Sequence, residues 1–139
     1  MNNHEFFAII PARKGSKGII NKNLQIIGNK PMIQFTFESA KKATLINHLI
    51  LSSDDERIIS LAKKIGINAP FIRPKNLSLD DSKTSDVVLH SIEWFKTSFG
   101  HIPKNIMLLQ PTSPFRSSED INCAIRTFLN SKKKTLVSV

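Results

Sequence analysis

Short apolar runs alternate with longer amphipathic stretches along most of this 139-residue chain. The apolar runs predict buried strands, and the stretches in which apolar residues recur every three or four positions predict helices. Strands are expected at 6–12, 48–53, 69–73 and 105–109, and helices at 31–43, 54–65, 85–99 and 118–130. Strands and helices that alternate at this spacing form parallel sheets with right-handed crossovers. The sequence therefore predicts a doubly wound α/β fold with a mostly parallel sheet.

Several residues predict where these elements begin and end. Pro31 is expected at the first helical position of its helix. Ser53 and Glu56 have the spacing of a capping box at the start of the next helix, and Gly66 is expected to end that helix. Residues 135–139 have the composition of a further strand. A chain that stops on such a strand is also what a truncated product would look like.

Composition limits the kind of protein that this chain can be. No apolar run approaches the ~20 residues that a membrane-spanning helix needs. The N-terminus lacks the basic region and apolar run of a signal peptide. Cys123 is the single cysteine, so an internal disulfide is excluded and a reducing, cytoplasmic setting is expected. Its position among the apolar residues of a helix predicts a buried, structural cysteine.

The formal net charge of +9 is concentrated rather than spread. Residues 13–30 contain five cations and no acid. Such a segment favours a small polyanionic ligand, whereas single-strand nucleic-acid binders interleave basic and aromatic residues, a pattern that is absent here. We therefore expect neither nucleic acid nor a membrane as a partner.

The basic segment directly follows the first expected strand and contains two glycines, Gly15 and Gly18. Glycines let the backbone bend tightly and approach a ligand, and exposed backbone N–H groups together with cations can hold phosphates. The cations here are Arg13, Lys14, Lys17 and Lys22. The spacing matches neither the P-loop nor the dinucleotide-binding fingerprint. The segment predicts a polyphosphate cradle, with an ordinary basic surface loop as the alternative.

Polar residues also follow the other expected strands: Asp54, Arg73 and Gln110. Ligands of such folds bind beyond the carboxyl ends of the strands, so these residues are expected to meet the basic segment at one edge. Arg73 can pair with a phosphate or carboxylate, and Gln110 can read a nucleobase edge. Each has a simpler alternative: a surface arginine beside a turn proline for Arg73, and a rigid proline-containing turn for Gln110. Asp54 can hold Mg²⁺ or ribose hydroxyls, or simply belong to the first turn of a helix.

Three motifs taken together make the chain resemble the acylneuraminate cytidylyltransferases, the CMP-N-acetylneuraminic acid synthetases. They are Ile-Pro-Ala-Arg-Lys-Gly-Ser-Lys-Gly (10–18) followed by Lys22-Asn23, then Arg73-Pro74, then Leu-Gln-Pro-Thr-Ser-Pro-Phe-Arg (109–116). The resemblance covers essentially all 139 residues. It implies a Rossmann-like fold of the nucleotide-diphospho-sugar transferase type. It also implies transfer of CMP from CTP to an acylneuraminate or related nonulosonic acid, with release of pyrophosphate and assistance from Mg²⁺.

The resemblance further implies roles for individual residues. Arg13 and Lys22 would hold the triphosphate and act in catalysis. The nucleotide site would comprise Arg13, Ser16, Lys22, Asn23, Arg73, Thr84 and Ser85. The sugar-acid site would comprise Gln110, Thr112 and Ser113, with Gln110 facing the sugar acid or lying between sugar and nucleotide.

Members of this family continue past the point where this sequence stops. Their further part carries a dimerisation segment and carboxylates that bind Mg²⁺, and no residue here matches those carboxylates. We therefore expect residues 1–139 to form a single nucleotide-binding domain of a homodimeric cytidylyltransferase, without its own metal ligands. The alternative is a non-catalytic or incomplete CTP-binding fragment of such an enzyme.

Overall fold

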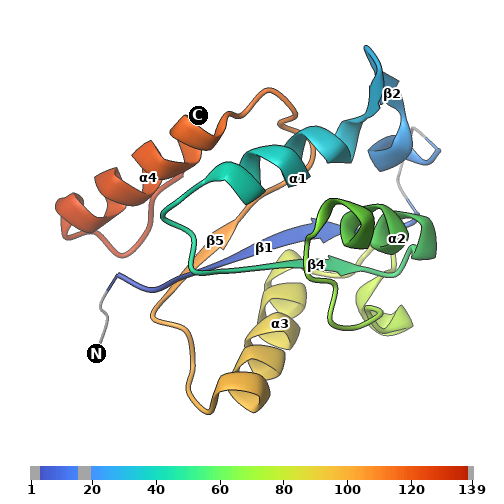
Figure 1. Ribbon diagram of the computed structural model, residues 1–139. Coiled ribbons are helices and arrows are strands. Elements are labelled where there is room, and N and C mark those ends of the chain that lie inside the picture. The colour runs from blue at the N-terminus through green and yellow to red at the C-terminus, as the bar shows by residue number, and fades with distance from the viewer. Residues whose placement is uncertain (1–3, 16–19, 138–139) are drawn as a thin grey trace.

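A parallel sheet forms the centre of the protein in the computed structural model, which describes residues 4–15 and 20–137 (Figure 1). Its three strands have the order β4-β1-β5. The central strand is β1 (Phe6–Ala12), flanked by β4 (His48–Ser53) and β5 (Asn105–Leu108). Both pairings with β1 are parallel, as in the register of Ile9 with Ile50 and with Leu108. The prediction of an α/β fold with a parallel sheet is confirmed.

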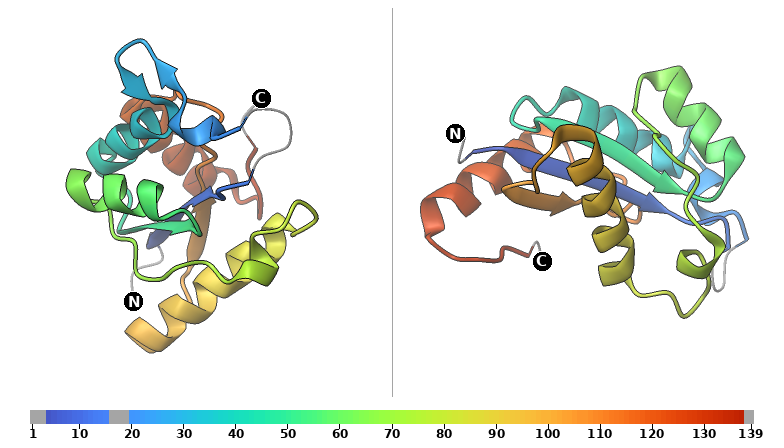
Figure 2. Two further views of the ribbon diagram at one scale, coloured as in Figure 1. Left: turned by 90° about the vertical axis from the view of Figure 1, so that its right-hand side faces the viewer. Right: turned by 90° about the horizontal axis from the view of Figure 1, so that it is seen from below.

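Helices cover both faces of this sheet (Figures 1 and 2). On one face lie α1 (Met32–Lys42), α2 (Glu56–Ile65) and α4 (Ser118–Ser131). On the other lies α3 (Thr84–Phe99). A small antiparallel pair, β2 (Ile26–Ile27) and β3 (Lys30–Pro31), precedes α1, and two short 3₁₀ helices, η1 (Lys22–Leu24) and η2 (Lys75–Leu77), lie in loops. Sequence reasoning did not predict these four short elements.

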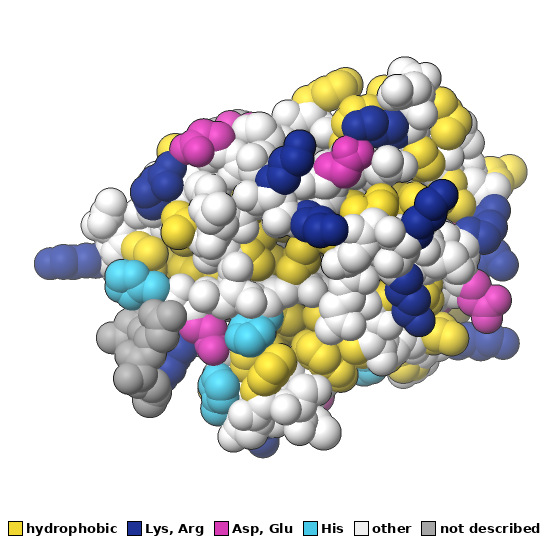
Figure 3. Space-filling view, viewed as in Figure 1, with side chains coloured by type: hydrophobic (Ala, Val, Ile, Leu, Met, Phe, Trp, Pro, Cys, Tyr) yellow, Lys and Arg dark blue, Asp and Glu magenta, His cyan; other side chains and the backbone are white. Residues whose placement is uncertain are grey.

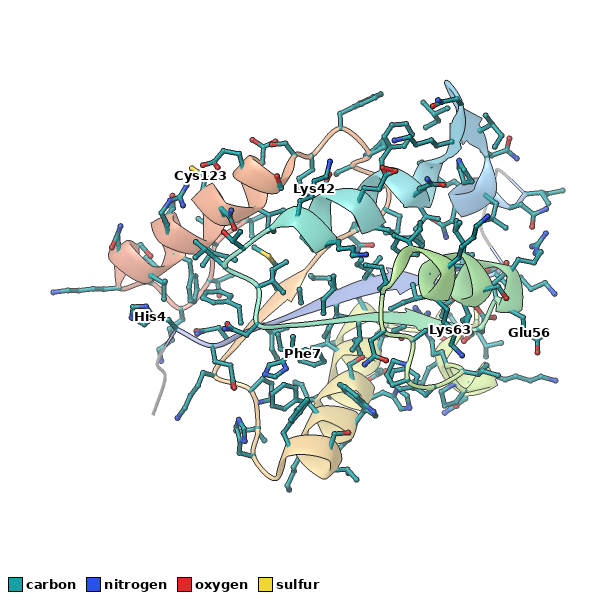
Figure 4. The ribbon with its side chains drawn as sticks, in the orientation of Figure 1. His4, Phe7, Lys42, Glu56, Lys63 and Cys123 are labelled. Carbon is teal, nitrogen blue, oxygen red and sulfur yellow. The ribbon has the colours of Figure 1, made fainter. Side chains whose placement is uncertain are left out.

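The two hydrophobic cores share β1. Its residues Phe6, Ala8 and Ile10 pack in the core beneath α1, α2 and α4. Phe7 and Ile9 point to the opposite face, where the Phe7 ring centroid lies 4.8 Å from that of Phe95 in α3 (Figure 4). A strand buried on both faces needs a continuous apolar run, which is why β1 could be located from the sequence.

The start of α2 differs from the prediction. The N-cap is Asp55, whose carboxylate accepts a hydrogen bond from the backbone N–H of Arg57 at 2.9 Å. The hydroxyl of Ser53 instead accepts from the backbone N–H of Asp55. The predicted Ser53–Glu56 capping box is therefore wrong, because a better acceptor stands two residues closer to the helix. Gly66 ends α2 as predicted, with a φ of 98° that a side chain would disfavour.

The expected strand at 69–73 is absent. Only an isolated bridge joins Asn68 to Ile50 of β4, and the segment beyond it meets β4 again where the backbone N–H of Arg73 donates to the carbonyl of Ser53 at 2.8 Å. Pro70 has no N–H to contribute to a ladder, which breaks the pairing between these two points. The segment thus runs beside β4 without becoming a strand.

Two helices bury positions that the sequence pattern did not indicate. Helix α3 buries Val87, Ser91 and Phe95, while the apolar residue Leu89 of the same helix is 59% exposed. In α4, Cys123 is exposed and points away from the sheet, so the prediction of a buried cysteine is wrong (Figure 4). The inward position beside it belongs to Asn122.

Asn122 is buried for a structural reason. Its Oδ1 accepts from the backbone N–H of Leu45 and its amide group donates to the Thr44 hydroxyl, which ties α4 to the loop after α1. Residues 135–137 are exposed and belong to no strand, while 138–139 lie outside the described part of the chain. None of the helices in the described ranges has the length and apolar character to cross a bilayer.

Candidate functional site

A pocket of about 160 Å³ opens beyond the carboxyl end of β1. It is lined by Pro11, Arg13, Arg73, Leu77, Ser82, Thr84, Val87 and Gln110. These residues come from the ends of β1 and β5, from the segment after α2, from η2 and from the start of α3. The prediction that the polar residues after successive strands meet at one sheet edge is confirmed for Arg13, Arg73 and Gln110.

Arg73 is a buried side chain of the pocket that makes several hydrogen bonds. It is only 5% exposed, and its guanidinium donates to the hydroxyl and carbonyl oxygens of Ser52 and to the carbonyl of Leu77, at 3.1, 2.8 and 3.3 Å. Burial lowers the pKa of Arg73, and the charge of Arg13 lowers it further, against the opposing effect of Asp54. An arginine nevertheless stays protonated in proteins. The pocket therefore contains a rigid cation whose hydrogen-bond partners are all neutral, and the alternative of a simple surface arginine is wrong.

Arg13 brings a second cation to the pocket, but this one is paired. Its Nη1 lies 2.6 Å from Oδ1 of Asp80, a residue of the loop before α3. The side chain of Arg13 is 26% exposed and that of Asp80 is 61% exposed, so the ion pair is open to solvent. Such a contact can be exchanged for an anionic ligand at little cost.

Gln110 lines the pocket beside a residue that sequence reasoning did not assign. The carbonyl oxygen of Gln110 accepts a hydrogen bond from Nη2 of Arg116 at 3.2 Å. Within the described residues, Nη1 of Arg116 is buried without a hydrogen-bond partner, and burial lowers the pKa of Arg116 while Asp120 raises it. Arg116 closes the predicted motif at 109–116, and its position there was the available signal. Ser82, which does line the pocket, was also missed, because its loop carried no motif.

The predicted site residues divide into two groups. The structure brings Arg13, Arg73, Thr84 and Gln110 together around one pocket. The other predicted residues within the described ranges do not line it: Lys22, Asn23, Ser85, Thr112 and Ser113. Ser16 lies outside the described residues.

Asn23 nevertheless lies next to the pocket. Its side-chain amide donates to the carbonyl oxygen of Arg13 at 3.4 Å, which joins η1 to the end of β1. Lys22 is its immediate neighbour in η1. Cations are also frequent on the face formed by α1 and α2, with few acidic side chains between them (Figure 3). Neither helix contributes to the lining of the pocket, so this charge adds only a general attraction for anions.

Two carboxylates near the pocket are already engaged. Oδ1 of Asp54 accepts from the backbone N–H of Lys14 at 2.7 Å, and Asp80 pairs with Arg13. In the part of the chain that the structure describes, no three His, Cys, Asp or Glu residues cluster as metal ligands would. Mg²⁺ commonly takes one or two protein carboxylates, together with phosphates and water. These residues do not fit a preformed magnesium site.

Comparison with known proteins places the chain among cytidylyltransferases. Residues 7–139 match the family described as cytidylyltransferase. A pseudaminic acid cytidylyltransferase of Campylobacter jejuni is 38% identical over 128 residues, which are 92% of this chain and 55% of that protein. An N-acylneuraminate cytidylyltransferase of Escherichia coli is 33% identical, over 97% of this chain and 31% of that protein. A CMP-N,N'-diacetyllegionaminic acid synthase of Legionella pneumophila is 35% identical, over 85% of this chain and 50% of that protein.

Solved structures support the fold. That of CMP:2-keto-3-deoxy-manno-octonic acid synthetase complexed with CTP superimposes with a TM-score of 0.72 at 23% identity, over 91% of this chain and 48% of that one. A cytidylyltransferase from Leptospira borgpetersenii gives a TM-score of 0.68 at 19% identity, over 92% of this chain and 50% of that one. The chain thus spans about half the length, or less, of the proteins it matches.

Proposed function

Because the chain belongs to the cytidylyltransferase family, we propose that it is the CTP-binding part of an enzyme that transfers CMP from CTP to a nonulosonic acid. The acceptor would be an acylneuraminate or a related acid, and pyrophosphate would leave. The observation that carries the proposal is the pocket beyond β1, where the cations Arg13 and Arg73 face the same space as Thr84 and Gln110.

The reaction requires groups that position the substrates and neutralise phosphate charge, and the residues at the carboxyl end of β1 can supply some of them. The anomeric hydroxyl of the sugar acid attacks the α-phosphate in line with the departing pyrophosphate. Catalysis of such a transfer depends on positioning and on neutralising charge. In the proposal, Arg13 exchanges Asp80 for the triphosphate, and Lys22 supplies a second cation from η1, with Ser16 as a further contact. No step is assigned to a metal, since no cluster of metal-ligating side chains occurs within the described residues.

The remaining predicted residues would hold the two organic parts of the substrates. Arg73 and Thr84 supply donors to the acceptor-rich edge of cytosine, with Asn23 and Ser85 at the margin of the nucleotide site. Gln110, through its side-chain amide, would lie between nucleotide and sugar acid. Thr112 and Ser113 lie on the exposed loop that leads away from Gln110, and in the proposal their hydroxyls contact the sugar acid.

Nucleotide binding is the first test of this proposal. Titration calorimetry should show that the 139-residue chain binds CTP, and binds it more tightly than UTP or ATP. Arg13→Ala should weaken CTP binding, whereas Arg126→Ala should not, because Arg126 pairs with Glu119 on exposed α4. Absence of CTP binding, with and without Mg²⁺, would refute the proposal. The same comparison tests Mg²⁺ as the proposed cofactor.

Pyrophosphate release is the second test. N-acetylneuraminic, pseudaminic and diacetyllegionaminic acids would be offered with CTP, since relatives carry the names of these acids or of their cytidylyltransferases. A second candidate is CTP binding without transfer, which the short span of the chain relative to its relatives favours. CTP binding with no pyrophosphate release from any of the acids would select this second candidate.

Assembly and location follow from the family as further parts of the proposal. A homodimer is expected, and light scattering of the purified chain would measure its mass. A cytoplasmic location is expected, and fractionation of cells that produce the protein would test it.

A further inference from the structure

One backbone position at the start of the basic segment is held from outside that segment. Lys14, directly after Arg13, donates its backbone N–H to Oδ1 of Asp54 at 2.7 Å. Asp54 immediately follows β4, the neighbour of β1 in the sheet. A carboxylate that accepts a backbone N–H makes a charge-assisted hydrogen bond, which is stronger than one between neutral groups. Asp54 therefore restrains the backbone next to Arg13.

A second position, next to Lys22, is held by the same short stretch of chain. Nη2 of Arg57 donates to Oδ1 of Asn21 at 2.8 Å, across 36 residues of sequence. Asn21 has a φ of 53°, in the left-handed region that asparagine tolerates better than most residues, and it precedes Lys22 at the start of η1. Figure 1 shows α2, which carries Arg57, beside the segment that leads to β2.

Arg57 is itself fixed in place. Its Nε lies 3.2 Å from Oδ1 of Asp55 and its Nη2 lies 2.9 Å from Oδ2. Asp55 is only 3% exposed, and it also caps α2. The hydrogen bonds and the charge of Asp55 raise the pKa of Arg57. Because the buried carboxylate of Asp55 holds Nε and one N–H of Nη2, the second N–H of Nη2 is oriented toward Asn21.

We propose that Asp54 and Arg57 are positioning residues for triphosphate binding, acting through Lys14 and Asn21 on the two predicted phosphate-binding cations, Arg13 and Lys22. Neither Asp54 nor Arg57 lines the pocket. The inference rests on the proposed function, because it assumes that a triphosphate binds at Arg13 and Lys22. Its physical basis is pre-organisation: backbone positions that are fixed before binding need not be ordered by the ligand.

This proposal predicts a pattern that simple electrostatics does not. Removing the negative charge of Asp54 beside two cations should strengthen triphosphate binding if only charge matters. If Asp54 positions Lys14, Asp54→Ala should instead weaken CTP binding, by about three- to tenfold for one lost hydrogen bond. Asp54→Asn keeps an acceptor oxygen without the charge, so it should bind CTP at least as tightly as wild type.

The contact between Arg57 and Asn21 is tested by changing Asn21, because truncating Arg57 would leave the buried Asp55 without its partner. Asn21→Gly tolerates the left-handed backbone but removes the acceptor, and should weaken CTP binding by about three- to tenfold. Asn21→Asp keeps the acceptor but adds a negative charge beside Lys22, so it should recover only part of the affinity that Asn21→Gly loses. Arg126→Ala, in the exposed pair with Glu119 on α4, serves as the remote control.

The ligand series separates positioning from a general structural defect. Calorimetry with CTP, inorganic pyrophosphate and CMP would be run on each variant, alongside its melting temperature. We expect Asp54→Ala and Asn21→Gly to lose affinity for CTP and pyrophosphate while keeping their affinity for CMP. Equal losses for all three ligands, or CTP affinities that match wild type, would overturn the inference and leave the proposed function standing. Absence of CTP binding by the wild-type chain would overturn both.

Discussion

The ion pair between Arg13 and Asp80 is expected to compete with CTP. A triphosphate oxygen that approaches Nη1 of Arg13 competes for its charge with the carboxylate of Asp80, which lies 2.6 Å away. Replacing Asp80 by Asn removes the competing charge and keeps the size of the side chain. We therefore predict that Asp80→Asn binds CTP more tightly than wild type.

The size of the effect follows from the exposure of the pair. Asp80 is 61% exposed and Arg13 is 26% exposed, so solvent screens their attraction. Exposed ion pairs contribute about 0.2–1 kcal/mol. Since CTP no longer has to displace this contact, its affinity should rise by about 1.4- to fivefold. A much larger gain would mean that the pair is stronger than its exposure indicates.

Calorimetric titration with CTP at low and at high salt measures the change. Asp81→Asn is the matched control, because it removes the same charge one residue away and no ion pair involves Asp81 within the described residues. The gain of Asp80→Asn over Asp81→Asn isolates the direct contact from the general rise in positive charge. Salt should reduce both effects, since exposed charges are screened within about 10 Å at 0.1 M. If Asp80→Asn binds CTP no more tightly than Asp81→Asn, the reasoning is refuted.

Three further predictions concern the buried framework of the site. Arg73→Lys cannot reproduce the hydrogen bonds that the guanidinium makes, so CTP affinity should fall by about tenfold or more; unchanged affinity in the same titration would contradict this role. Asp55→Ala removes the cap of α2 and the partner of Arg57, and should lower the free energy of unfolding by about 1–3 kcal/mol in urea. Burial opposes ionisation of Asp55, but hydrogen bonds from Arg57 outweigh it and lower its pKa. The stabilisation by ionised Asp55 is therefore fully present above the ordinary aspartate pKa of about 3.9. It is lost as the pH falls through the lower pKa that Asp55 has in the folded protein. Asp55→Ala should remove this pH dependence from acid-unfolding curves. Phe95→Ala should lower the free energy of unfolding by about 3–5 kcal/mol, because Phe95 is fully buried. Leu89→Ala on the same helix should change it by no more than about 0.5 kcal/mol, because Leu89 is exposed. Similar losses of stability for both variants would mean that α3 packs on a different face.

Elements with a strong local pattern could be predicted from the sequence. Strand β1 was found because its apolar run is continuous, and α2 ended at Gly66 because glycine adopts the left-handed conformation required there. Choices between adjacent positions could not be predicted. Asp55 rather than Ser53 caps α2, where it also binds Arg57. Asn122 rather than Cys123 faces inward, because Asn122 accepts a hydrogen bond from the loop after α1.

The same limit applies to the site. Fold topology predicts that the residues after β1 and β5 share an edge, so Arg13 and Gln110 could be placed together. Their actual partners are brought in by loop conformations: Asp80 belongs to no motif, and the motif at 109–116 contains Arg116 without indicating its contact with Gln110. The burial of Arg73 likewise depends on acceptors from β4 and η2 that a one-dimensional pattern does not contain.

The packing of the central strand, β1, also determines the position of Arg13, which directly follows it. Phe7 and Ile9 of β1 fill one core, while Ala8 and Ile10 fill the other. Sliding β1 by one residue would force Phe7 into space shaped for alanine and leave a void on the opposite face. Packing on both faces therefore allows β1 only one register. Because Arg13 directly follows β1, this register also determines how far beyond the sheet Arg13 lies. Conformational change on ligand binding is therefore expected in the side chains that follow β1 and not in the strand itself.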